Sequence, residues 1–417
     1  MEIINQYNIL ELKSLIQRNN YQVLLYGAGL GVSSYSKILI ASLSYNNISA
    51  KYFVDDDCQR HGDELYGLKI IGPGEIENYV QNPLIIISSN YFESIFSSIK
   101  KLNRNFPVYS STGLLQETAS EAYKGVMDFN EVQRRLHTHT SKLNRILSED
   151  QGPGGLIFNA IDIQVTEKCS MKCIDCSNLM QYYEKPINAD KNLLESSLEK
   201  LLNSVDKIYD ARVLGGEPFL YNDLDVTLRM LSLSETVQNI TVYSNATFVP
   251  KEHLLLALAH QKIQVEITDY DELSKRHKQM MEVFDERGIR YITHKPQNWT
   301  DSARIVKNNL TDNELSTMFE RCCVNDALTL LHGKIYHCPF SGNAHNLGAI
   351  EFDSSDWVDV SLADDSADLR KKLKAFYYKK SFQTACKYCL GRDFTQKQVV
   401  PALQTKKSIP IPIFAAK

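Results

Sequence analysis

Cysteine is the residue type whose spacing in this sequence most directly indicates chemistry. The 417-residue chain contains nine cysteines, and seven of them stand in groups with short spacings. Cys169, Cys173 and Cys176 lie within one short segment, CSMKCIDC. In a reducing compartment, thiols grouped in this way are more often metal ligands than disulfide partners. We therefore expect this segment to bind a metal centre.

The C-x3-C-x2-C spacing of this segment directly follows residues 161–166, an apolar run that predicts a β-strand. Three thiolates from one loop can hold three irons of a cubane cluster and leave the fourth iron open to another ligand. An open coordination position is what inner-sphere catalysis needs. Structural zinc usually has four protein ligands, so three cysteines with no fourth nearby argue against it.

Two further motifs stand at the ends of the next two predicted strands. They are Gly215-Gly216-Glu217-Pro218 and Ser244-Asn245. CSMKCIDC resembles the cluster loop of the radical S-adenosylmethionine superfamily. The three motifs together agree with that family in their order, their spacing and their placement at strand ends. The first motif matches the family's GGEP, and the second stands where the family often has Thr-Asn-Gly. Without the cysteines, GGEP would indicate only a strand-to-helix turn.

The resemblance implies a catalytic [4Fe-4S] cluster whose open iron is chelated by the amino and carboxylate groups of S-adenosylmethionine. The glycines would let the backbone approach the methionyl end closely. Glu217 would accept a hydrogen bond from the amino group, and Ser244 and Asn245 would contact the carboxylate or ribose. The backbone of Asp175 would meet the adenine, although many members have an aromatic residue there. One electron then cleaves the sulfonium, and the resulting 5'-deoxyadenosyl radical abstracts a hydrogen from the substrate.

A second set of cysteines follows in the carboxyl-terminal part of the chain. Its members are Cys322, Cys323, Cys338, Cys386 and Cys389. Counting one of the adjacent pair, four thiolates complete a closed cluster site. The region resembles the SPASM/twitch auxiliary-cluster regions of radical S-adenosylmethionine enzymes, in which cysteines flank a short hairpin. The resemblance favours a second [4Fe-4S] cluster, and a structural zinc on the same cysteines is the alternative.

Adjacent cysteines rarely both ligate one metal. We expect Cys322 to be the ligand, and Cys323 is the alternative. The other thiol is either a packed core residue or a hydrogen-atom donor that faces the substrate. The donor role would suit an epimerase, because a substrate radical must be quenched from the opposite face. Cys323 is therefore a candidate catalytic residue.

The elements that must position these motifs alternate between apolar runs and helical patterns. Over residues 156–310 the alternation predicts an α/β fold, a full or partial barrel with its site at the carboxyl ends of the strands. The resemblance to the radical S-adenosylmethionine superfamily implies a partial (βα)6 TIM-type barrel. Residues 311–417 form the expected auxiliary-cluster region. Asp269 and Tyr270 end one predicted strand and are candidates to bind substrate or to act as acid or base. Capping of the strand end is the alternative.

Residues 1–115 predict a small Rossmann-like α/β domain, and residues 116–155 predict a helical linker. The stretch resembles the nucleotide- or sugar-nucleotide-binding domains of bacterial polysaccharide-modifying enzymes. The expected phosphate contacts are Gly27, Gly29 and Gly31, and Asp55 and Asp56 are the candidates to hold a ribose hydroxyl. A domain that serves only docking or assembly is the alternative.

Bulk composition narrows the class of partner. The chain is 43% hydrophobic and 23% charged with a net charge of −4, so nothing marks a nucleic-acid partner. No apolar run reaches the ~20 residues that span a bilayer. The first twenty residues predict an amphipathic helix and lack the features of a signal peptide. We expect a cytoplasmic protein with no membrane partner.

Together the resemblances indicate a radical enzyme of surface-polysaccharide or natural-product biosynthesis. We expect hydrogen abstraction from a sugar or nucleotide-linked sugar, leading to epimerisation, dehydrogenation or rearrangement. The resemblance also implies an electron donor such as flavodoxin or ferredoxin. One alternative is a maturase of a ribosomal peptide, although no winged-helix peptide-binding module is visible. Another is a non-catalytic iron–sulfur or zinc scaffold.

Overall fold

The structure is a computed structural model of the chain, which divides into two compact units, Met1–Pro153 and Gly154–Lys417. No helix among the described residues combines the length and apolarity needed to cross a membrane. The residues that the structure describes are 3–4, 9–28, 35–89, 92–102, 104–109, 111–127, 129, 132, 136, 155–296, 299–325, 327–363, 365–379, 381–392, 397–412 and 414.

The amino-terminal unit is built around a seven-stranded sheet with the order β1-β7-β6-β2-β3-β5-β4. The central strand β2 pairs in parallel with β3 and with β6, whereas β4 and β5 are antiparallel. The strands are β1 (Ile3–Ile4), β2 (Gln22–Tyr26), β3 (Ala50–Val54), β4 (Glu64–Leu65), β5 (Leu68–Ile71), β6 (Pro83–Ile87) and β7 (Val108–Tyr109).

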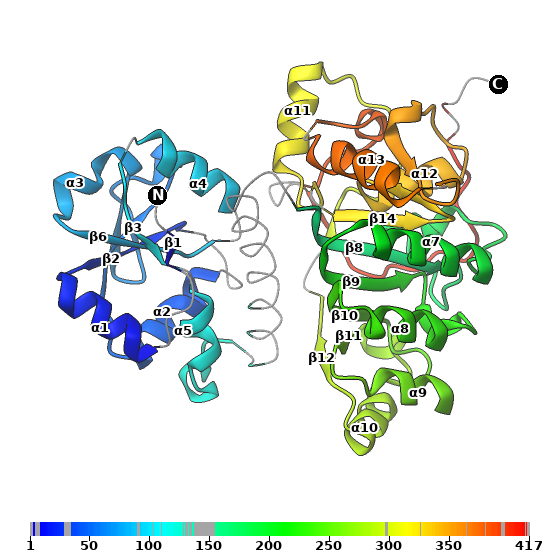
Figure 1. Cartoon of the computed structure of the whole chain (residues 1–417), viewed down its shortest axis with the longest axis horizontal. Helices are drawn as coiled ribbons and strands as arrows, with labels where there is room; N and C mark the ends of the chain where they lie inside the picture. Colours follow the sequence, from blue (N-terminus) through cyan, green and yellow to red (C-terminus); the bar gives the residue numbers. More distant parts are fainter. Residues whose placement is uncertain are drawn as a thin grey trace. The chain divides into compact units, whose positions relative to one another are not determined.

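Helices cover both faces of this sheet. Val23 and Leu25 of β2 belong to one apolar cluster, and Leu24 and Tyr26 belong to another, as the alternation of side chains along a strand requires. Figure 1 shows α1, α2 and α5 on the first face and α3 and α4 on the second. The helices are α1 (Ile9–Asn19), α2 (Tyr35–Tyr45), α3 (Ile76–Tyr79), α4 (Phe92–Lys101) and α5 (Thr112–Glu117).

The carboxyl-terminal unit contains an eight-stranded sheet with the order β12-β11-β10-β9-β8-β14-β15-β16. The strands from β12 to β14 in this order pair in parallel, and β14, β15 and β16 are antiparallel. The strands are β8 (Ile157–Thr166), β9 (Lys207–Gly215), β10 (Val237–Ser244), β11 (Ile263–Thr268), β12 (Tyr291–His294), β14 (Ala327–Leu331), β15 (Lys334–Tyr336) and β16 (Trp357–Asp359).

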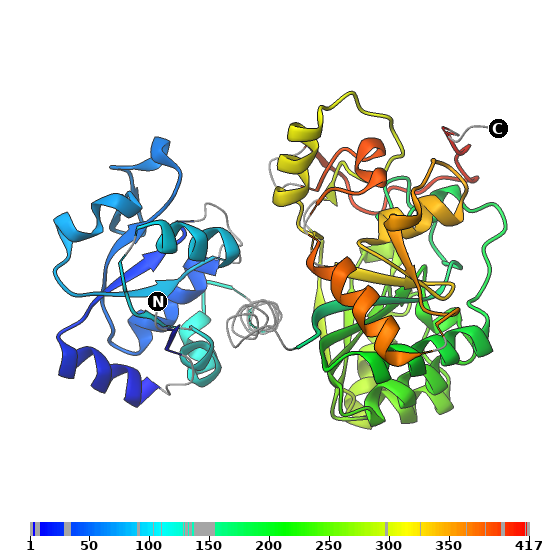
Figure 2. The same ribbon diagram turned by 45° about the horizontal axis from the view of Figure 1, so that its top comes forward.

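Helices follow the parallel strands and pack on one face of this sheet (Figure 1). They are α7 (Lys191–Ser204), α8 (Leu224–Leu233), α9 (Glu252–Leu258) and α10 (His277–Arg287), and α13 (Ser366–Tyr378) lies beside α7 in Figure 2. Leu194, Leu198 and Leu201 lie on one face of α7 and are buried in the core. The α/β class predicted from the alternation of strands and helices is therefore confirmed.

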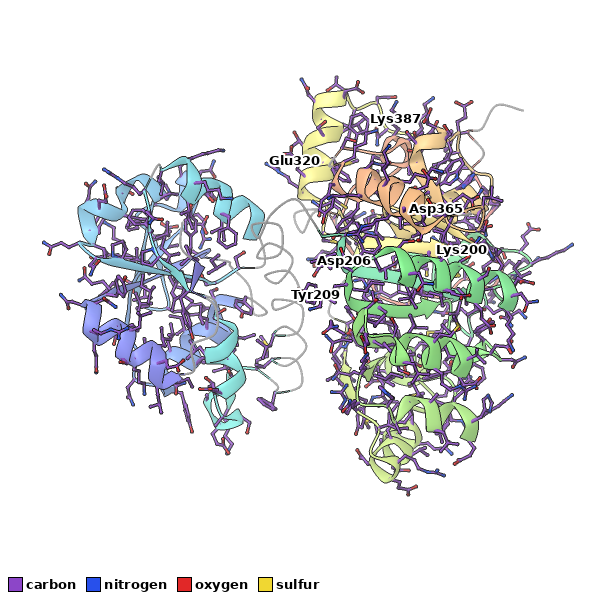
Figure 3. All side chains as sticks on the ribbon, viewed as in Figure 1. Lys200, Asp206, Tyr209, Glu320, Asp365 and Lys387 are labelled. Atoms are coloured by element: carbon purple, nitrogen blue, oxygen red, sulfur yellow. The ribbon has the colours of Figure 1, made fainter. Side chains whose placement is uncertain are left out.

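The region expected to hold the auxiliary site, residues 311–417, belongs to the same compact unit as residues 156–310. Its strand β14 pairs with β8, and Lys200 on α7 donates a hydrogen bond to the carbonyl of Ser361 (2.6 Å). Asp206, just before β9, pairs with Arg370 on α13; Figure 3 labels Lys200 and Asp206. The other α-helices and strands that the structure describes in this unit are α11 (Asp312–Arg321), α12 (Pro339–Asn346) and the strand pair β13 (Trp299–Thr300) and β17 (Gln398–Val399).

Candidate active site

The carboxyl ends of neighbouring parallel strands meet at one edge of a sheet. At this edge of the carboxyl-terminal unit, the segment with Cys169, Cys173 and Cys176 follows β8, and Gly215 ends β9. Ser244 ends β10, and β11 is followed by Asp269 and Tyr270. Motifs that are far apart in the sequence are thus brought to a common edge.

The three thiols of the first cysteine set (Cys169, Cys173 and Cys176) lie close together in an apolar setting. They pack with Met171, Tyr270 and other apolar side chains. Burial raises the pKa of the Cys173 thiol to about 12, and Cys176 adds to this shift electrostatically. Burial also raises the pKa of the Cys169 thiol, and Cys176 and Cys173 again contribute.

This donor set fits a cationic metal centre. One buried and two partly buried thiols that repel one another as thiolates need positive charge close by, and a bound metal supplies it and deprotonates its ligands. The amide of Met171 already donates to the Cys169 sulfur (3.4 Å), as expected for a loop that stabilises a thiolate. Within the described part of the chain, no three His, Cys, Asp or Glu side chains converge on a single metal ion.

The glycines of the GGEP motif have a packing role. A Cβ atom on Gly215 would lie 2.2 Å from the carbonyl oxygen of Thr166, and one on Gly216 would lie 2.2 Å from that of Lys168. The Gly216 and Glu217 amides donate to the same two carbonyls (2.9 and 2.8 Å). Because only glycine permits this approach, the motif holds the chain that leads into Cys169. Contact of the glycines with S-adenosylmethionine stays a prediction.

Glu217 is fully buried and ties β9 to β10. Its carboxylate accepts hydrogen bonds from the Ser244 hydroxyl (3.0 Å) and the Asn245 amide (2.8 Å). Burial raises the pKa of this carboxyl to about 7, while these hydrogen bonds act in the opposite direction. The sequence predicted Glu217, Ser244 and Asn245 as ligand contacts, and the structure brings all three together.

The Asn245 side chain faces the cysteine segment. Its Nδ2 lies 3.6 Å from the Cys169 sulfur and 3.2 Å from the hydroxyl of Ser170. Its Oδ1 accepts hydrogen bonds from the amide and hydroxyl of Thr247 (3.1 and 2.6 Å). These bonds orient the amide so that its N–H groups point to the first cysteine set.

Asp175 has a partner that the sequence did not reveal. Its buried carboxylate is bonded to the Arg304 guanidinium, with Nε at 2.8 Å and Nη2 at 3.4 Å. Arg304 lies 129 positions away, and no local pattern marks it. The side chain of Asp175 is therefore committed to this ion pair, and its predicted backbone contact with adenine stays a prediction.

The neighbours Asp269 and Tyr270 have different surroundings. Tyr270 belongs to the apolar cluster of the first cysteine set and meets Trp299 edge-on, with ring centroids 6.0 Å apart. Asp269 lines a hollow with basic residues and lies 3.9 Å from both His277 and Lys295. Of the two candidates, Tyr270 is therefore better placed to contact a group that the three cysteines bind.

The second cysteine set consists of Cys322, Cys338, Cys386 and Cys389, which come from three separate segments. Cys322 follows α11, and Cys338 caps α12 and accepts a hydrogen bond from the Ser341 amide (3.4 Å). Cys386 lies within a short 3-10 turn, and Cys389 caps its end. Burial raises the pKa of the Cys322 thiol to about 12, and Cys338 adds to the shift. Burial also raises the pKa of the Cys386 thiol, with contributions from Cys338, Cys389 and Cys322.

A carboxamide holds the loop that carries the last two cysteines. Asn308 Nδ2 donates to the carbonyls of Cys386 (2.8 Å) and Cys389 (2.9 Å). The amide of Gly391, at a positive φ of 82°, donates to the Cys389 sulfur (3.3 Å). The four thiols fit a metal centre for the reason given for the first set. The choice between iron–sulfur and zinc stays a prediction.

Arg392 lies between the two cysteine sets. Its guanidinium donates to the Ser177 carbonyl (3.1 Å), next to Cys176, and its own carbonyl accepts the Cys323 amide (3.1 Å). Burial raises the pKa of the Cys176 and Cys338 thiols, and Arg392 acts against both shifts. The sequence analysis missed this arginine, although it follows Cys389 by only three residues.

Cys323 is exposed, whereas Cys322 is partly buried. This difference agrees with Cys322 as the member of the metal-binding group. The donor role of Cys323 stays a prediction.

The sheet face opposite the apolar core carries charged side chains. Asp162 on β8 and Arg212 on β9 are partners in register and form an ion pair (2.6 Å). Thr241 on β10 is the register partner of Arg212 and donates to Asp210 (2.8 Å). Burial raises the pKa of the Asp162 carboxyl, and Arg212 and Arg392 lower it. This polar face is therefore electrostatically linked to the residue between the cysteine sets.

The polar face continues across the next strands. Tyr243 and Glu266 are partners in register on β10 and β11, and the Glu266 carboxylate lies 3.7 Å from His294 Nδ1 on β12. Burying such groups costs free energy that an apolar strand would not cost, and buried titratable clusters are typical of functional sites.

In the amino-terminal unit, the structure describes Gly27, Asp55 and Asp56, whereas Gly29 and Gly31 lie outside the described residues. Gly27 has a φ of +106°, and a Cβ there would lie 2.5 Å from Ser89 Cβ. The Asp55 carboxylate accepts from the Ala28 amide (2.7 Å), and Asp56 accepts from Tyr26 (3.0 Å). Both carboxylates are thus engaged within the unit, and their contacts with a nucleotide stay predictions.

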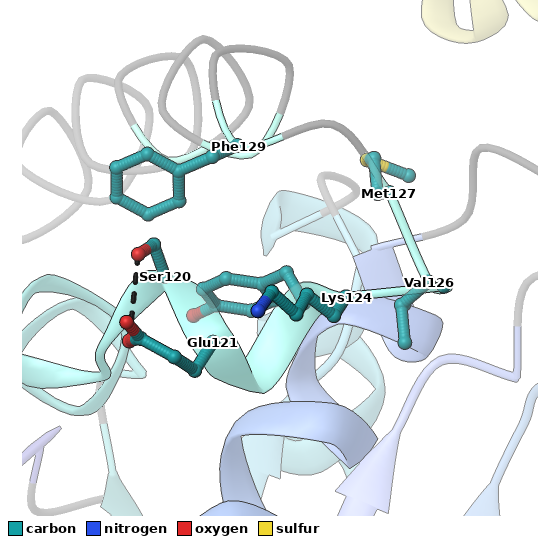
Figure 4. A pocket seen from close by; sticks show the side chains of 8 residues that line it. Ser120, Glu121, Lys124, Val126, Met127 and Phe129 are labelled. Atoms are coloured by element: carbon teal, nitrogen blue, oxygen red, sulfur yellow. Dashed lines mark hydrogen bonds between the residues drawn. The ribbon is translucent and has the colours of Figure 1, made fainter.

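A separate hollow in this unit holds none of the predicted site residues. It is lined by Tyr123 and, among others, the residues labelled in Figure 4: Ser120, Glu121, Lys124, Val126, Met127 and Phe129.

Comparisons with known proteins extend to both units. Residues 19–105 match a family model described as C2185-like, N-terminal. Among curated proteins, none matches the chain. BtrN in complex with AdoMet and 2-DOIA is similar at 19% identity, over 57% of this chain and 95% of that chain, with a TM-score of 0.37.

Two other solved structures are similar over smaller parts of their own chains. Streptococcus suis SuiB bound to S-adenosylmethionine shares 16% identity over 48% of this chain and 43% of that chain, with a TM-score of 0.29. Native anSMEcpe with bound AdoMet and Cp18Cys peptide shares 16% identity over 34% and 42%, with a TM-score of 0.27. At these TM-scores the likenesses do not establish a fold, and the functional argument depends on the residues described above.

Proposed function

We propose that this protein is a radical S-adenosylmethionine enzyme that abstracts hydrogen from a sugar or nucleotide-linked sugar. The observation that carries the proposal is the meeting of three strand-end motifs at one sheet edge. The first cysteine set, the GGEP segment and Ser244-Asn245 follow β8, β9 and β10, with Asn245 Nδ2 3.6 Å from the Cys169 sulfur. Their order along the chain and their spacing are those of the family that the sequence resembles.

In this proposal Cys169, Cys173 and Cys176 would hold a [4Fe-4S] cluster through three of its irons, which would leave one iron for S-adenosylmethionine. When bound, the cluster supplies the single electron that cleaves the sulfonium to methionine and a 5'-deoxyadenosyl radical. The chain's own residues orient the reactants. Asn245 and Ser170 present polar groups beside Cys169, and Tyr270 and Trp299 exclude water from the sulfurs.

The polar sheet face supports a hydroxyl-rich substrate. Sugar hydroxyls need both donors and acceptors, and this face offers the Asp162 and Glu266 carboxylates, the Arg212 guanidinium and the Tyr243 hydroxyl. An apolar substrate would offer these groups no hydrogen bonds in place of the water that it displaces.

The outcome of the reaction depends on what happens to the substrate radical. In a dehydrogenation, the radical would lose one electron to a second iron–sulfur cluster, a role that zinc could not fill, and one proton to a base. In an epimerisation, the radical would instead take a hydrogen atom from a thiol, for which Cys323 is the candidate, and the thiyl radical left behind would be reduced by one electron from the external donor and one proton. A maturase of ribosomal peptides would use the same first step with a different substrate.

The test is anaerobic reconstitution followed by assays for 5'-deoxyadenosine with nucleotide sugars, free sugars and peptides. We expect about eight irons per chain for two cubanes, and an increase in 5'-deoxyadenosine with a sugar and not with a peptide. Product formed only with peptides would contradict the sugar assignment. A reduced and reconstituted protein that never cleaves S-adenosylmethionine would contradict the enzyme assignment as a whole.

A further inference from the structure

Residues 402–408 run alongside the first cysteine set and form one isolated antiparallel bridge with it. Cys173 and Gln404 form an isolated antiparallel bridge. The amide of Ile174 donates to the carbonyl of Leu403 (2.8 Å), and the amide of Thr405 donates to that of Lys172 (2.8 Å). The cysteine loop is therefore hydrogen-bonded at Cys173 and its two neighbours to a segment more than two hundred positions further along the chain.

Beyond Gln404, the same segment is hydrogen-bonded again to the cysteine loop and to the residues that follow that loop. Lys172 Nζ donates to the hydroxyl of Ser408 (2.8 Å), which in turn donates to the carbonyl of Tyr183 (3.0 Å). The amide of Ile409 donates to the carbonyl of Gln181 (2.8 Å). Together with the bridge, these bonds hold Gln404 opposite Cys173.

The orientation of the Gln404 side chain follows from its neighbours. Its Oε1 accepts the amide N–H of Lys172 (2.7 Å), and its Nε2 donates to the carbonyl of Ala402 (2.7 Å). Exchanging the two atoms would place a donor against a donor and an acceptor against an acceptor. The second N–H of Nε2 is therefore directed at the Cys173 sulfur, 3.1 Å away.

We propose that Gln404 is a positioning residue that donates a hydrogen bond to a ligand sulfur of the catalytic cluster and raises the reduction potential of that cluster. This inference rests on the proposed function, because it takes Cys173 to be a cluster ligand. Reduction adds one negative charge, which the ligand sulfurs share. A fixed N–H donor stabilises the more negative state, so the potential increases.

The experiment compares full-length reconstituted proteins in which Gln404 is changed to Met or to Glu. Methionine keeps the length of the side chain and removes the donor, and glutamate keeps the acceptor for Lys172 and adds negative charge. Thr405→Ala is the matched control, because the Thr405 hydroxyl donates to the carbonyl of Lys407 (2.8 Å) in the same segment. Iron content and thermal unfolding establish that each variant is folded and loaded.

Redox titration followed by electron paramagnetic resonance is the readout. We expect the potential of the cluster whose signal responds to S-adenosylmethionine to fall in Gln404→Met, to fall further in Gln404→Glu and to stay unchanged in Thr405→Ala. A second cluster, where present, serves as an internal control, because its potential should not move.

Unchanged potentials in both Gln404 variants would overturn the inference and leave the proposed function intact. An equal shift in Thr405→Ala would also overturn it, because the effect would then arise from the segment as a whole. Failure of both Gln404 variants to hold the cluster, with Thr405→Ala fully loaded, would replace tuning with a purely structural role. A wild-type protein with no cluster on the first cysteine set would overturn both the inference and the proposed function.

Discussion

The two cysteine sets each bring several thiols close together, but they differ in how many segments of the chain supply those thiols. The first set lies within a single segment, Cys169 to Cys176, that follows one strand. The second set brings together Cys322, Cys338 and the Cys386–Cys389 loop, which belong to three segments. In both sets burial raises the pKa of the thiols, so both need compensating positive charge.

This difference has a physical consequence. A local loop keeps its ligands close together in every conformation of the chain, so metal bound there adds little to tertiary stability. Ligands from three segments come together only in the folded protein, so metal bound there stabilises the fold by linkage. We therefore expect loss of the first set to affect mainly the reaction, and loss of the second set to lower the stability of the fold.

The largest expected effect is the loss of catalysis on removal of the first set. In a variant with Cys169, Cys173 and Cys176 all changed to Ala, production of 5'-deoxyadenosine should fall below detection by mass spectrometry. Iron should fall by about four per chain, the content of one cubane. Cys58→Ala is the matched control, because Cys58 is exposed in the other unit. Retained cleavage in the triple variant would contradict the role given to this set.

The next effect concerns stability and separates Cys322 from Cys323. Cys322→Ala should lose the metal of the second set, whereas Cys323→Ala should retain it. Loss of a ligand present at about 100 times its Kd lowers the free energy of unfolding by about 2.7 kcal/mol. This change corresponds to a fall in Tm of roughly 5–11 °C for a unit of this size.

Metal analysis together with thermal unfolding measures this second effect. Cleavage of S-adenosylmethionine should persist in Cys322→Ala, since the first set is unchanged. The reverse pattern, with metal lost only in Cys323→Ala, would exchange the roles of the two thiols.

A smaller effect distinguishes the first site through its buried carboxyl. Burial raises the pKa of Glu217 to about 7 in the folded chain. A raised pKa contributes stability that is fully present below the ordinary value near 4.5 and is lost as the pH rises through about 7. The shift corresponds to about 3 kcal/mol. In metal-free protein, Glu217→Gln should flatten the fall in unfolding free energy between these two pH values.

Urea unfolding at several pH values measures the Glu217 effect. Glu252→Gln is the control, because Glu252 is an exposed carboxylate paired with Arg287. An unchanged pH dependence in Glu217→Gln would show that the buried carboxyl does not titrate in this range.

The smallest effect should arise at the residue between the two sets. Arg392→Met removes a positive charge near Cys176 and near Cys322, Cys338 and Cys389. The potentials of both centres should therefore fall, whereas Gln404→Met should move only one. Arg392→Lys keeps the charge and should keep both potentials closer to wild type. A shift confined to one centre would place the guanidinium with that centre alone.

Sequence patterns predicted the local parts of this molecule well. The alternation of strands and helices predicted the α/β class, because side-chain periodicity depends on nearby residues. The meeting of Glu217, Ser244 and Asn245 was foreseeable, because each stands at the end of a parallel strand. The packing role of Gly215 and Gly216 against Thr166 and Lys168 was not foreseen, because it depends on how two strand ends approach each other.

The sequence by itself determined which residues can do chemistry. Cys169, Cys173 and Cys176 lie in one short segment, so they stay close together however the rest of the chain folds. Only the tertiary structure decided which side chains surround them. Gln404 reaches Cys173 across 231 positions, and Arg304 reaches Asp175 across 129. Such contacts depend on how distant segments pack, and no local periodicity encodes them. Side-chain chemistry is thus a property of the sequence, whereas the electrostatic environment that tunes it is a property of the fold.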